Sequence, residues 1–339
     1  MDKNRHNDVD DAMLFRIAKE YYVFGMKEDV IARKENVSRP HISRLLKLAK
    51  QRGMIKVSVQ LPNDAEIDRI AQRLRQMSGL SFLDVVYVPT RFKNDLKKTS
   101  LDIASEASEV IGEYLSGCHA TGVGWGYTIY ETAKQLAYAD VAWGGDFTPL
   151  VGISSESSPY LQVNTITGNF AEKSYGHAKY VNLPIALDGA QQASRLEKEK
   201  LSTLERQWEH LDSAVIGLGA PYRQNDVFMI SEAGEFYKTV LSRENAVGDI
   251  LSTFFHEDGS IVNIPSEYRI VAMNLGNLHR IPKVLCLAGG HEKVLGIFTA
   301  IHARFFNGLI TDSNTAIELL KLYDDEAGHE VPQQGRHHE

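Results

Sequence analysis

The chain is poor in the residues that would make it a disulfide-rich or membrane-spanning protein. Among 339 residues there are only two cysteines, Cys118 and Cys286, both in apolar stretches. Two cysteines are too few for a disulfide framework or a zinc cluster, so a reducing compartment is expected. No apolar run approaches the roughly 20 residues of a membrane-spanning helix. The first residues, MDKNRHNDVDDAM, lack the apolar core of a secretory signal. We therefore expect a cytoplasmic protein without a membrane partner.

The acidic surplus of the chain is confined to one part of it. The formal net charge is −7 overall. Residues 1–60 nevertheless hold 13 Lys and Arg against 8 Asp and Glu, a net of +5, whereas the remaining residues carry −12. The segment 33–56 alone contains eight basic residues and one glutamate. A basic head on an acidic body indicates that only the head contacts nucleic acid.

Residues 28–60 show the pattern of a helix-turn-helix followed by a wing. A short helix and a turn lead to Ser38, a good helix cap, and a second helix then runs to Gly53. This helix repeats apolar residues at the spacing of one buried face. They are Ile42, Leu45, Leu46 and Ala49. The alternation of residues 55–60 predicts a strand that forms the wing.

The opposite face of the second helix predicts contacts with double-stranded DNA. The residues assigned to DNA contact are Ser38, Arg39, His41, Ser43, Arg44 and Lys47. Arg39 and Arg44 suit bidentate pairing with guanine, and Ser43 suits a base or a phosphate. Lys47 suits a phosphate contact, which positions the module without reading sequence. The alternative is a basic amphipathic helix with a solvated face.

The rest of the chain alternates predicted strands with longer helices. This alternation predicts an α/β body with a doubly wound, mostly parallel sheet. The predicted strands include 83–88, 119–123, 147–153, 179–183, 213–218, 261–263, 283–288 and 308–311. The last helix is expected over 313–322.

We expect three parts along the chain. Residues 1–61 form the helix-turn-helix DNA-binding domain. Residues 62–325 form the domain for effector binding and oligomerisation. Residues 326–339 form a polar tail.

Three predicted strand ends run into glycine, at 122-GVGWGYT-128, 217-GLGAP-221 and 288-AGGHEK-293. In open α/β sheets ligands bind beyond the carboxyl ends of strands. Thr128 and Lys293 each begin a helix there and predict a phosphate site. The first loop is a poor match to a dinucleotide fingerprint, so no cofactor is expected. The histidines lack metal-ligand spacing, so no metal site is expected.

Other polar and aromatic residues beside apolar segments are candidates for sugar recognition. Gln162, Asn164, Asp249 and Glu267 suit hydrogen bonds to sugar hydroxyls, with capping and turn roles as the alternative. Trp125 lies inside a glycine loop. It is either a lid over the ligand or a plug in the core.

These segments together resemble the SorC family of bacterial transcriptional regulators. The resemblance rests on SRPHISRLLKLAKQRG (38–53) in the head and on GVGWGYT, VNT, LDSAVIGLGAP, AVGDILSTFFHEDG and LAGGHEKV in the body. It covers roughly residues 12–322. The family also includes the Bacillus-type deoxyribonucleoside regulator and the central glycolytic gene regulator.

The resemblance implies a body similar in fold to phosphosugar isomerases, without retained catalysis. It also implies a homo-oligomer, commonly a tetramer, that senses a sugar or sugar phosphate. By position, the residues at the phosphate end would be Gly124, Gly126, Thr128 and Lys293. Asp249 and Glu267 would lie near the hydroxyl end.

One segment departs from the family. Deoxyribonucleoside regulators resemble this chain but use a lysine just after the central strand to capture an aldehyde sugar covalently. The corresponding segment here, 148-TPLVGISSESSP-159, contains no lysine. We therefore expect non-covalent binding. The VNT segment looks closer to the sorbose-type regulators, which favours a ketose, a sugar alcohol or its phosphate.

The function that the sequence favours is a transcriptional regulator of carbohydrate use, controlled by a small-molecule effector. No catalytic residue is assigned. The first alternative is a phosphosugar isomerase-like enzyme with an accessory N-terminal domain, but no recognisable group orients a general base. The second is an architectural DNA binder with a structural body.

Overall fold

The structure is a computed structural model that describes residues 10–55, 64–188, 194–221, 243–264 and 268–329. The chain divides into two compact units, Met1–Pro62 and Asn63–Glu339. We call them the head and the body and describe each by itself.

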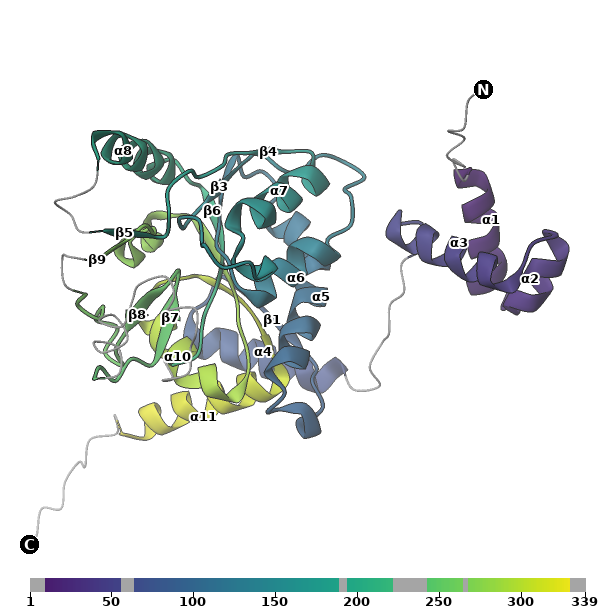
Figure 1. The fold of residues 1–339 in the computed structure, drawn as a ribbon. Helices are drawn as coiled ribbons and strands as arrows, with labels where there is room; N and C mark the ends of the chain where they lie inside the picture. Colours follow the sequence, from purple (N-terminus) through teal and green to yellow (C-terminus); the bar gives the residue numbers. More distant parts are fainter. Residues whose placement is uncertain (1–9, 56–63, 189–193, 222–242, 265–267, 330–339) are drawn as a thin grey trace, which may run out of the picture. The chain divides into compact units, whose positions relative to one another are not determined.

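The head is a three-helix unit with its own core (Figure 1). Its helices are α1 (Asp11–Tyr22), α2 (Glu28–Lys34) and α3 (Arg39–Gln51). The predicted face of α3 is buried, and α1 and α2 both pack against it. Ser38 occupies the N-cap of α3, although its side chain makes no capping hydrogen bond. The head thus has the form of a helix-turn-helix, and the predicted wing lies outside the described residues.

The turn between α2 and α3 is fixed by backbone conformation and by ion pairs. Asn36 has a φ of 52°, a left-handed conformation that asparagine tolerates better than most residues. Arg16 of α1 donates two hydrogen bonds, at 3.2 and 2.7 Å, to the carboxylate of Glu35, which directly precedes Asn36. Lys34 pairs with Glu20 of α1. These contacts link the turn to α1. The angle between α2 and α3 is therefore set by contacts with α1 as well as by the packing of α2 on α3.

A seven-stranded sheet forms the centre of the body. Every neighbouring pair of its strands is parallel. In spatial order the strands are β1 (Phe82–Val86), β11 (Gly308–Asp312), β10 (Lys283–Leu287), β6 (Ser213–Gly217), β2 (Ala120–Val123), β3 (Asp146–Pro149) and β4 (His177–Ala178). The predicted fold class is therefore confirmed.

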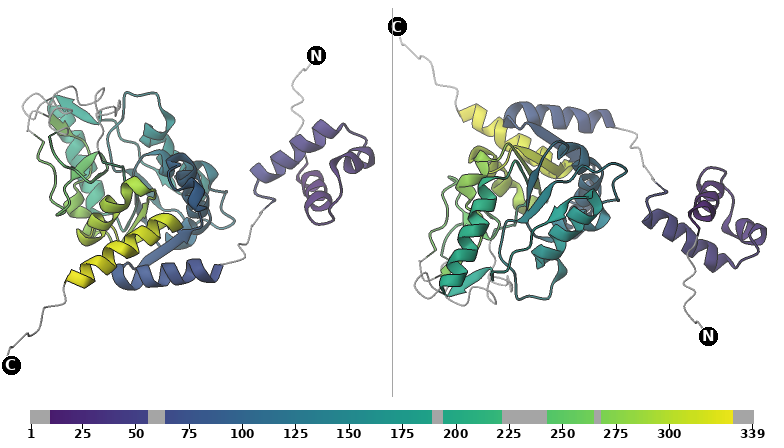
Figure 2. Two further views of the ribbon diagram at one scale, coloured as in Figure 1. Left: turned by 90° about the horizontal axis from the view of Figure 1, so that it is seen from below. Right: turned by 90° about the horizontal axis from the view of Figure 1, so that it is seen from above.

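Helices cover both faces of this sheet. One face carries α5 (Leu96–Tyr114), α6 (Tyr127–Gln135) and α7 (Val163–Ser174). The other carries α4 (Asp64–Ser78), α10 (Val294–His302) and α11 (Ser313–His329), and Figure 2 shows α4 and α11 side by side. The strands β5 (Ala186–Asp188) and β9 (Tyr268–Ile270) pair with each other, as do β7 (Gly248–Ile250) and β8 (Thr253–Phe255). Helix α8 (Arg195–Glu209) opens with a capping box made by Ser194 and Glu197.

Three sequence expectations for the body differ from the structure. Residues 179–183 form no strand, because both backbone groups of Val181 are hydrogen-bonded to the side chain of Asn164. The Asn164 amide N–H donates to the Val181 carbonyl at 2.9 Å, and the Asn164 side-chain oxygen accepts from the Val181 N–H at 3.0 Å. The expected strand 261–263 is reduced to one bridge between Ile261 and Phe255. Helix α11 continues to His329, beyond the expected end at residue 322.

Two half-buried carboxyls lie together beside the edge strand β1. Burial raises the pKa of Asp84 of β1 and of Glu106 of α5, and the charge of Asp84 raises the pKa of Glu106 further. A raised pKa in the folded state gives stability that is present at low pH and is lost as pH rises through the raised pKa. The pair therefore opposes folding near neutral pH.

We expect Asp84→Asn to stabilise the protein near pH 7.5. The gain should be up to about 1 kcal/mol, after discounting for solvent screening of a half-buried pair. It should shrink as the pH falls towards 4, where the wild-type carboxyl is protonated. Thermal melts of both proteins across this pH range measure the difference. Glu113→Gln, on the exposed side of α5, is the control. An equal gain at every pH would contradict the explanation that burial of the charged carboxyl destabilises the folded protein.

Candidate functional site

The order in which the chain adds strands to the sheet reverses between the neighbouring strands β2 and β6. From β2 the chain continues to β3 and β4 on one side, and from β6 it continues to β10 and β11 on the other. Loops that leave the carboxyl ends of two such strands diverge and create a crevice, the usual ligand position in this fold. Gly126 has a φ of 113°, which side chains disfavour, and this conformation lets the loop after β2 turn into α6.

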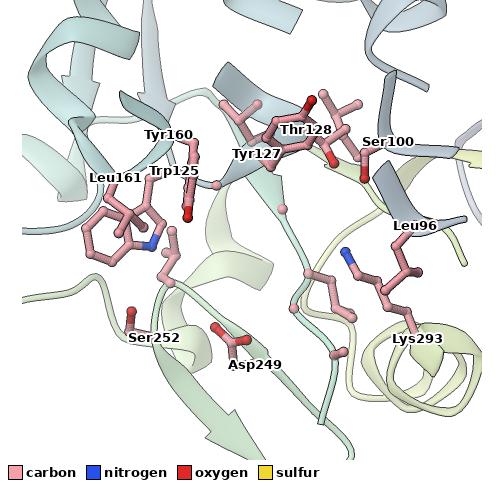
Figure 3. A pocket seen from close by; sticks show the side chains of 18 of the residues that line it. Leu96, Ser100, Trp125, Tyr127, Thr128, Tyr160, Leu161, Asp249, Ser252 and Lys293 are labelled. Atoms are coloured by element: carbon pink, nitrogen blue, oxygen red, sulfur yellow. The ribbon is translucent and has the colours of Figure 1, made fainter. Parts of the chain in front are cut away.

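A cavity of about 590 Å³ occupies this crevice (Figure 3). Residues from the start of α5, the β2–α6 loop, the loop after β6, the β7–β8 hairpin and the segment after β10 line it. The volume lies within the range of about 300–1,000 Å³ typical of small-molecule sites. All three glycine-rich strand ends contribute residues to this cavity.

One end of the cavity gathers hydrogen-bond donors that are not paired with any described residue. Ser100 of α5 and Thr128 of α6 are 8% and 6% exposed, and neither hydroxyl is hydrogen-bonded to any residue that the structure describes. The first turn of α6 adds backbone N–H groups and the positive end of the helix dipole. In Figure 3 the side chain of Lys293 points into this end of the cavity. Such an arrangement suits an anion.

Lys293 is held in an environment that disfavours its own charge. Burial lowers the pKa of its amine, and the carboxylate of Asp249 opposes this shift. Within the described part of the chain its amine has no hydrogen-bond partner. A desolvated ammonium without a hydrogen bond gains more from an anionic ligand than one in water does.

Asp249 reaches the cavity because a glycine faces it. The N–H of Gly219 donates to the carbonyl of Asp249 at 2.9 Å and joins the end of β6 to β7. A Cβ on Gly219 would lie 1.8 Å from the Asp249 carboxylate oxygen Oδ1, so any larger residue would displace that carboxylate. The following turn places Leu251 and Ser252 at φ values of 53° and 60°, an unusual conformation for both. Both residues are buried and line the cavity, where such strain is commonly found.

The other end of the cavity is aromatic. Trp125, Tyr160 and Leu161 lie there in Figure 3, with Ser252 beneath them. The N–H of Gly126 donates to the carbonyl of Tyr160 at 2.9 Å and holds the two loops together. Trp125 lines the cavity and also belongs to the hydrophobic core. The two interpretations of this residue, as a lid and as a plug, are therefore compatible.

The structure brings together most of the residues assigned to the effector. Trp125, Gly126, Thr128, Asp249 and Lys293 all line the cavity. They come from three separate segments of the chain: the loop and helix after β2, the hairpin strand β7 and the segment after β10.

Three assigned residues that the structure describes, Gly124, Gln162 and Asn164, do not line this cavity. Gly124 packs against Leu251 behind the loop, and its N–H donates to a carbonyl of β6. Gln162 donates to the carbonyl of Glu156, and Asn164 bonds Val181 as described above. For these two amides the structure supports the alternative of local structural roles. Glu267 lies outside the described residues.

Several lining residues gave no signal in the sequence. Ser100 lies inside an ordinary amphipathic helix, Tyr160 precedes the VNT segment, and Ser252 follows Asp249 in a hairpin that the sequence did not predict. Their side chains carry hydroxyls, which are common outside binding sites. Only the fold shows that they converge.

In the head, most of the residues assigned to DNA contact lie on the surface. Ser38, Arg39, Ser43, Arg44 and Lys47 are exposed and His41 is half-buried. The set therefore forms an accessible polar face on and just before α3.

Arg39 differs from Arg44 in having partners within the head. Its Nε lies 3.2 Å from Glu28 and 3.5 Å from Asp29, and the hydrogen bond to Glu28 raises the pKa of the guanidinium. No ion pair or hydrogen bond links Arg44 or Lys47 to another described residue. Any external contact of Arg39 would therefore compete with α2, whereas no described residue competes for Arg44.

No group of three or more His, Cys, Asp and Glu has the arrangement of a metal site among the residues that the structure places. Within the same residues no helix is both long enough and apolar enough to cross a membrane.

A helix-turn-helix head and a doubly wound α/β body with a cavity at its switch point define a two-unit class of protein. Residues 64–321 match the family described as "Putative sugar-binding domain", and the chain belongs to that family. The resemblance inferred from the motifs is thereby confirmed.

Named relatives cover nearly the whole chain. The deoxyribonucleoside regulator of Bacillus subtilis is 29% identical over 308 residues, which is 89% of this chain and 95% of that protein. The sorbitol operon regulator of Klebsiella pneumoniae is 24% identical over 317 residues, which is 93% of this chain and 99% of that protein.

Solved structures share the fold. The full-length sorbitol operon regulator SorC from Klebsiella pneumoniae superposes with a TM-score of 0.67 at 24% identity, covering 91% of this chain and 99% of that one. A transcriptional regulator from Streptococcus pneumoniae TIGR4 gives a TM-score of 0.67 at 24% identity, covering 78% and 99%.

Proposed function

We propose that this protein is a DNA-binding transcriptional regulator of a carbohydrate-utilisation operon, controlled by a sugar or sugar phosphate bound non-covalently in the body. The observation that carries the proposal is the presence of two separate binding surfaces in one chain. One is the exposed polar face of α3, and the other is the cavity at the switch point of the sheet. A regulator needs both, because one reads DNA and the other reads the metabolite.

The relatives support a regulator over an enzyme. Proteins that match nearly the whole chain are named regulators of deoxyribonucleoside or sorbitol genes, and none of those cited is named as an enzyme. The alternative of a phosphosugar isomerase-like enzyme also leaves the head without a role. A regulator of DNA acts where its operator is, which supports a cytoplasmic location.

The head is proposed to place α3 in the major groove of operator DNA. Arg44 is the residue best suited to read a guanine, because it is exposed and no residue that the structure describes competes for it. Lys47 contacts phosphate, and Ser38, His41 and Ser43 complete the polar face. Arg39 adds to the positive field from its place beside α2.

The body is proposed to bind the effector along the length of the cavity. An anionic group would lie against Lys293, Thr128 and the start of α6. Asp249 would accept hydrogen bonds from hydroxyls in the middle of the cavity. The indole of Trp125 would pack on the apolar face of the sugar.

Regulation is proposed to act through a homo-oligomer, a tetramer by analogy with the family. Pairs of heads would bind two half-sites, whose spacing follows from the symmetry of the bodies. The effector can change DNA affinity only by its different affinity for two arrangements of subunits, typically about 1–3 kcal/mol.

The full-length protein provides the test. Duplexes selected from a random pool should yield a defined binding sequence, and fluorescence anisotropy on that duplex should then be repeated with a panel of sugars, sugar alcohols and their phosphates. At least one compound should change the DNA affinity by about 5–150-fold. Failure to enrich any sequence, or a DNA affinity that no compound changes, would contradict the proposal.

A further inference from the structure

Aromatic side chains are exposed along one side of α1 and just beyond its end. Phe15 is 58% exposed, Tyr22 is 48% exposed and Phe24 is 62% exposed. None of the three belongs to the hydrophobic core that the structure describes for the head. An exposed apolar patch on a small unit commonly marks a surface that another element covers.

The exposed side of α1 has the spacing of a helix that pairs with another helix. We call it the α1 seam, and it consists of Ala12, Phe15, Lys19 and Tyr22, all of which are exposed. They follow one another at intervals of three, four and three residues, which are the a and d positions of a heptad. A lysine at one such position lowers the stability of a helix pair but selects its register.

The seam faces away from the surface proposed to contact DNA. Helix α1 packs against α3 through buried residues that include Leu14, Ile17 and Ala18. Successive residues of an α-helix are turned by about 100°, so the seam points away from this packed side. The polar face of α3 lies opposite the buried face of α3. A helix bound at the seam would therefore leave α3 free to enter a groove of DNA.

The seam is complementary to itself in one orientation. In an antiparallel pair, position 12 faces position 22 of the second copy and position 15 faces position 19, because both pairs share the midpoint 17. The small side chain of Ala12 would then lie against the large ring of Tyr22, and the ammonium of Lys19 against the ring of Phe15. A parallel pair would instead place two Lys19 ammoniums together.

Within one head, Lys19 already lies beside an aromatic ring. Its amine is 5.7 Å from the centre of the Phe24 ring. The ring of Phe15 from a second copy would add a second face to the same cation, an interaction that strengthens as the cation loses water.

We infer that the α1 seam is covered by the α1 helix of a second copy of this chain, packed antiparallel, so that two heads pair directly. The inference rests on the proposed function, in which heads act in pairs, and adds the surface by which they meet. One helix face is smaller than the interface of about 1,200 Å² or more that a stable complex needs. The seam therefore pairs heads that the bodies have already brought together.

Cysteines placed in the seam test the pairing in the full-length protein, without DNA or effector. The half-exposed native Cys118 is first replaced by serine, and Cys286 is buried. Ala12→Cys and Tyr22→Cys are then introduced singly and together. Within one helix the two positions are about 15 Å apart, too far for a disulfide. Mild oxidation should convert most of the double variant into a covalent dimer, and neither single variant to more than a trace.

DNA binding gives a second readout. Phe15→Ser removes one ring of the seam, so the affinity for a duplex with two half-sites should fall at least about tenfold as the linked second binding event is lost. The affinity for a single half-site should stay unchanged, which a misfolded head would not allow. Val30→Ser, at an exposed valine of α2, is the control and should change neither affinity. Equal losses on both duplexes in Phe15→Ser would show that Phe15 does not act in pairing.

The outcomes of cross-linking separate this inference from the proposed function. Circular dichroism establishes that each cysteine variant is folded. The absence of a covalent dimer from the folded double variant would overturn the inference, and covalent dimers from each single variant would indicate a parallel pair and overturn it as well. A protein whose heads do not meet through α1 can still select DNA and respond to a sugar. The proposed function fails separately, if no sequence is selected or no compound changes the DNA affinity.

Discussion

Replacing Lys293 with methionine is expected to weaken effector binding by about 2–5 kcal/mol, the usual loss when one partner of a buried charge pair is removed. Lys293 is the one cationic side chain among the described residues of the cavity. Methionine has a similar length but cannot neutralise an anionic group. Titration of the effector found by the panel above measures the loss. DNA binding without effector should stay unchanged, because the residue lies in the body.

The same variant should be more stable than the wild type. Burial lowers the pKa of the Lys293 amine, which means that the charged form is disfavoured in the folded protein. The unfolded chain binds the proton more tightly, so the wild type is penalised at neutral pH and less so as pH rises above the lowered pKa. The melting temperature of Lys293→Met should therefore exceed that of the wild type most clearly near neutral pH.

Opposite changes in binding and stability identify a functional lysine. Lys321→Met, on the exposed side of α11, provides the control and should alter neither quantity much. Wild-type effector affinity in Lys293→Met would show that the anionic group binds elsewhere. A fall in its melting temperature would show that the lysine stabilises the fold.

Replacing Arg44 with alanine is expected to cost about 1–3 kcal/mol of affinity for the selected operator, the range for a bidentate contact to guanine. The loss should be confined to duplexes that carry the contacted base, because Arg44 is exposed on α3 and no described residue holds it. Anisotropy titrations on the operator and on single-base variants measure the change. Effector binding in the body should stay as in the wild type.

Lys47→Ala provides the matched comparison on the same helix. A phosphate contact contributes equally to all sequences, so this change should weaken every duplex alike and reduce the salt dependence by about one charge. If Arg44→Ala behaved in this second way, Arg44 would be a phosphate contact. Arg39→Ala should have a smaller effect on base discrimination than Arg44→Ala, since Arg39 is already paired with Glu28.

Much of the local structure could be predicted from the sequence, because local periodicity encodes it. The buried face of α3 and the alternation of strands and helices both follow from which neighbours along the chain are apolar. The glycines at three strand ends also indicated where a ligand could approach the backbone. The predictions failed where a non-local contact replaced a local one, as when Asn164 took the backbone of Val181 from a strand partner.

The β7–β8 hairpin shows the same limit within the site. Its turn uses Leu251 and Ser252 in left-handed conformations, whereas the usual signal for such a turn is Asn-Gly. Packing against the loop after β2 supports the strained turn, since Leu251 lies against Gly124. No pattern along the sequence records that contact, and the position of Asp249 depends on it.

The sequence by itself determined that this protein has a basic helix-turn-helix head and an α/β body with glycine-rich strand ends, because residue spacing fixes which faces are buried. Only the tertiary structure decided that β2 and β6 are neighbours, that their loops diverge around one cavity, and that Lys293 and Asp249 face it together. The physical reason is that strand order depends on how helices cover both faces of the sheet. Strand order in turn decides which loops become neighbours, and the separation of two residues along the chain does not reveal this.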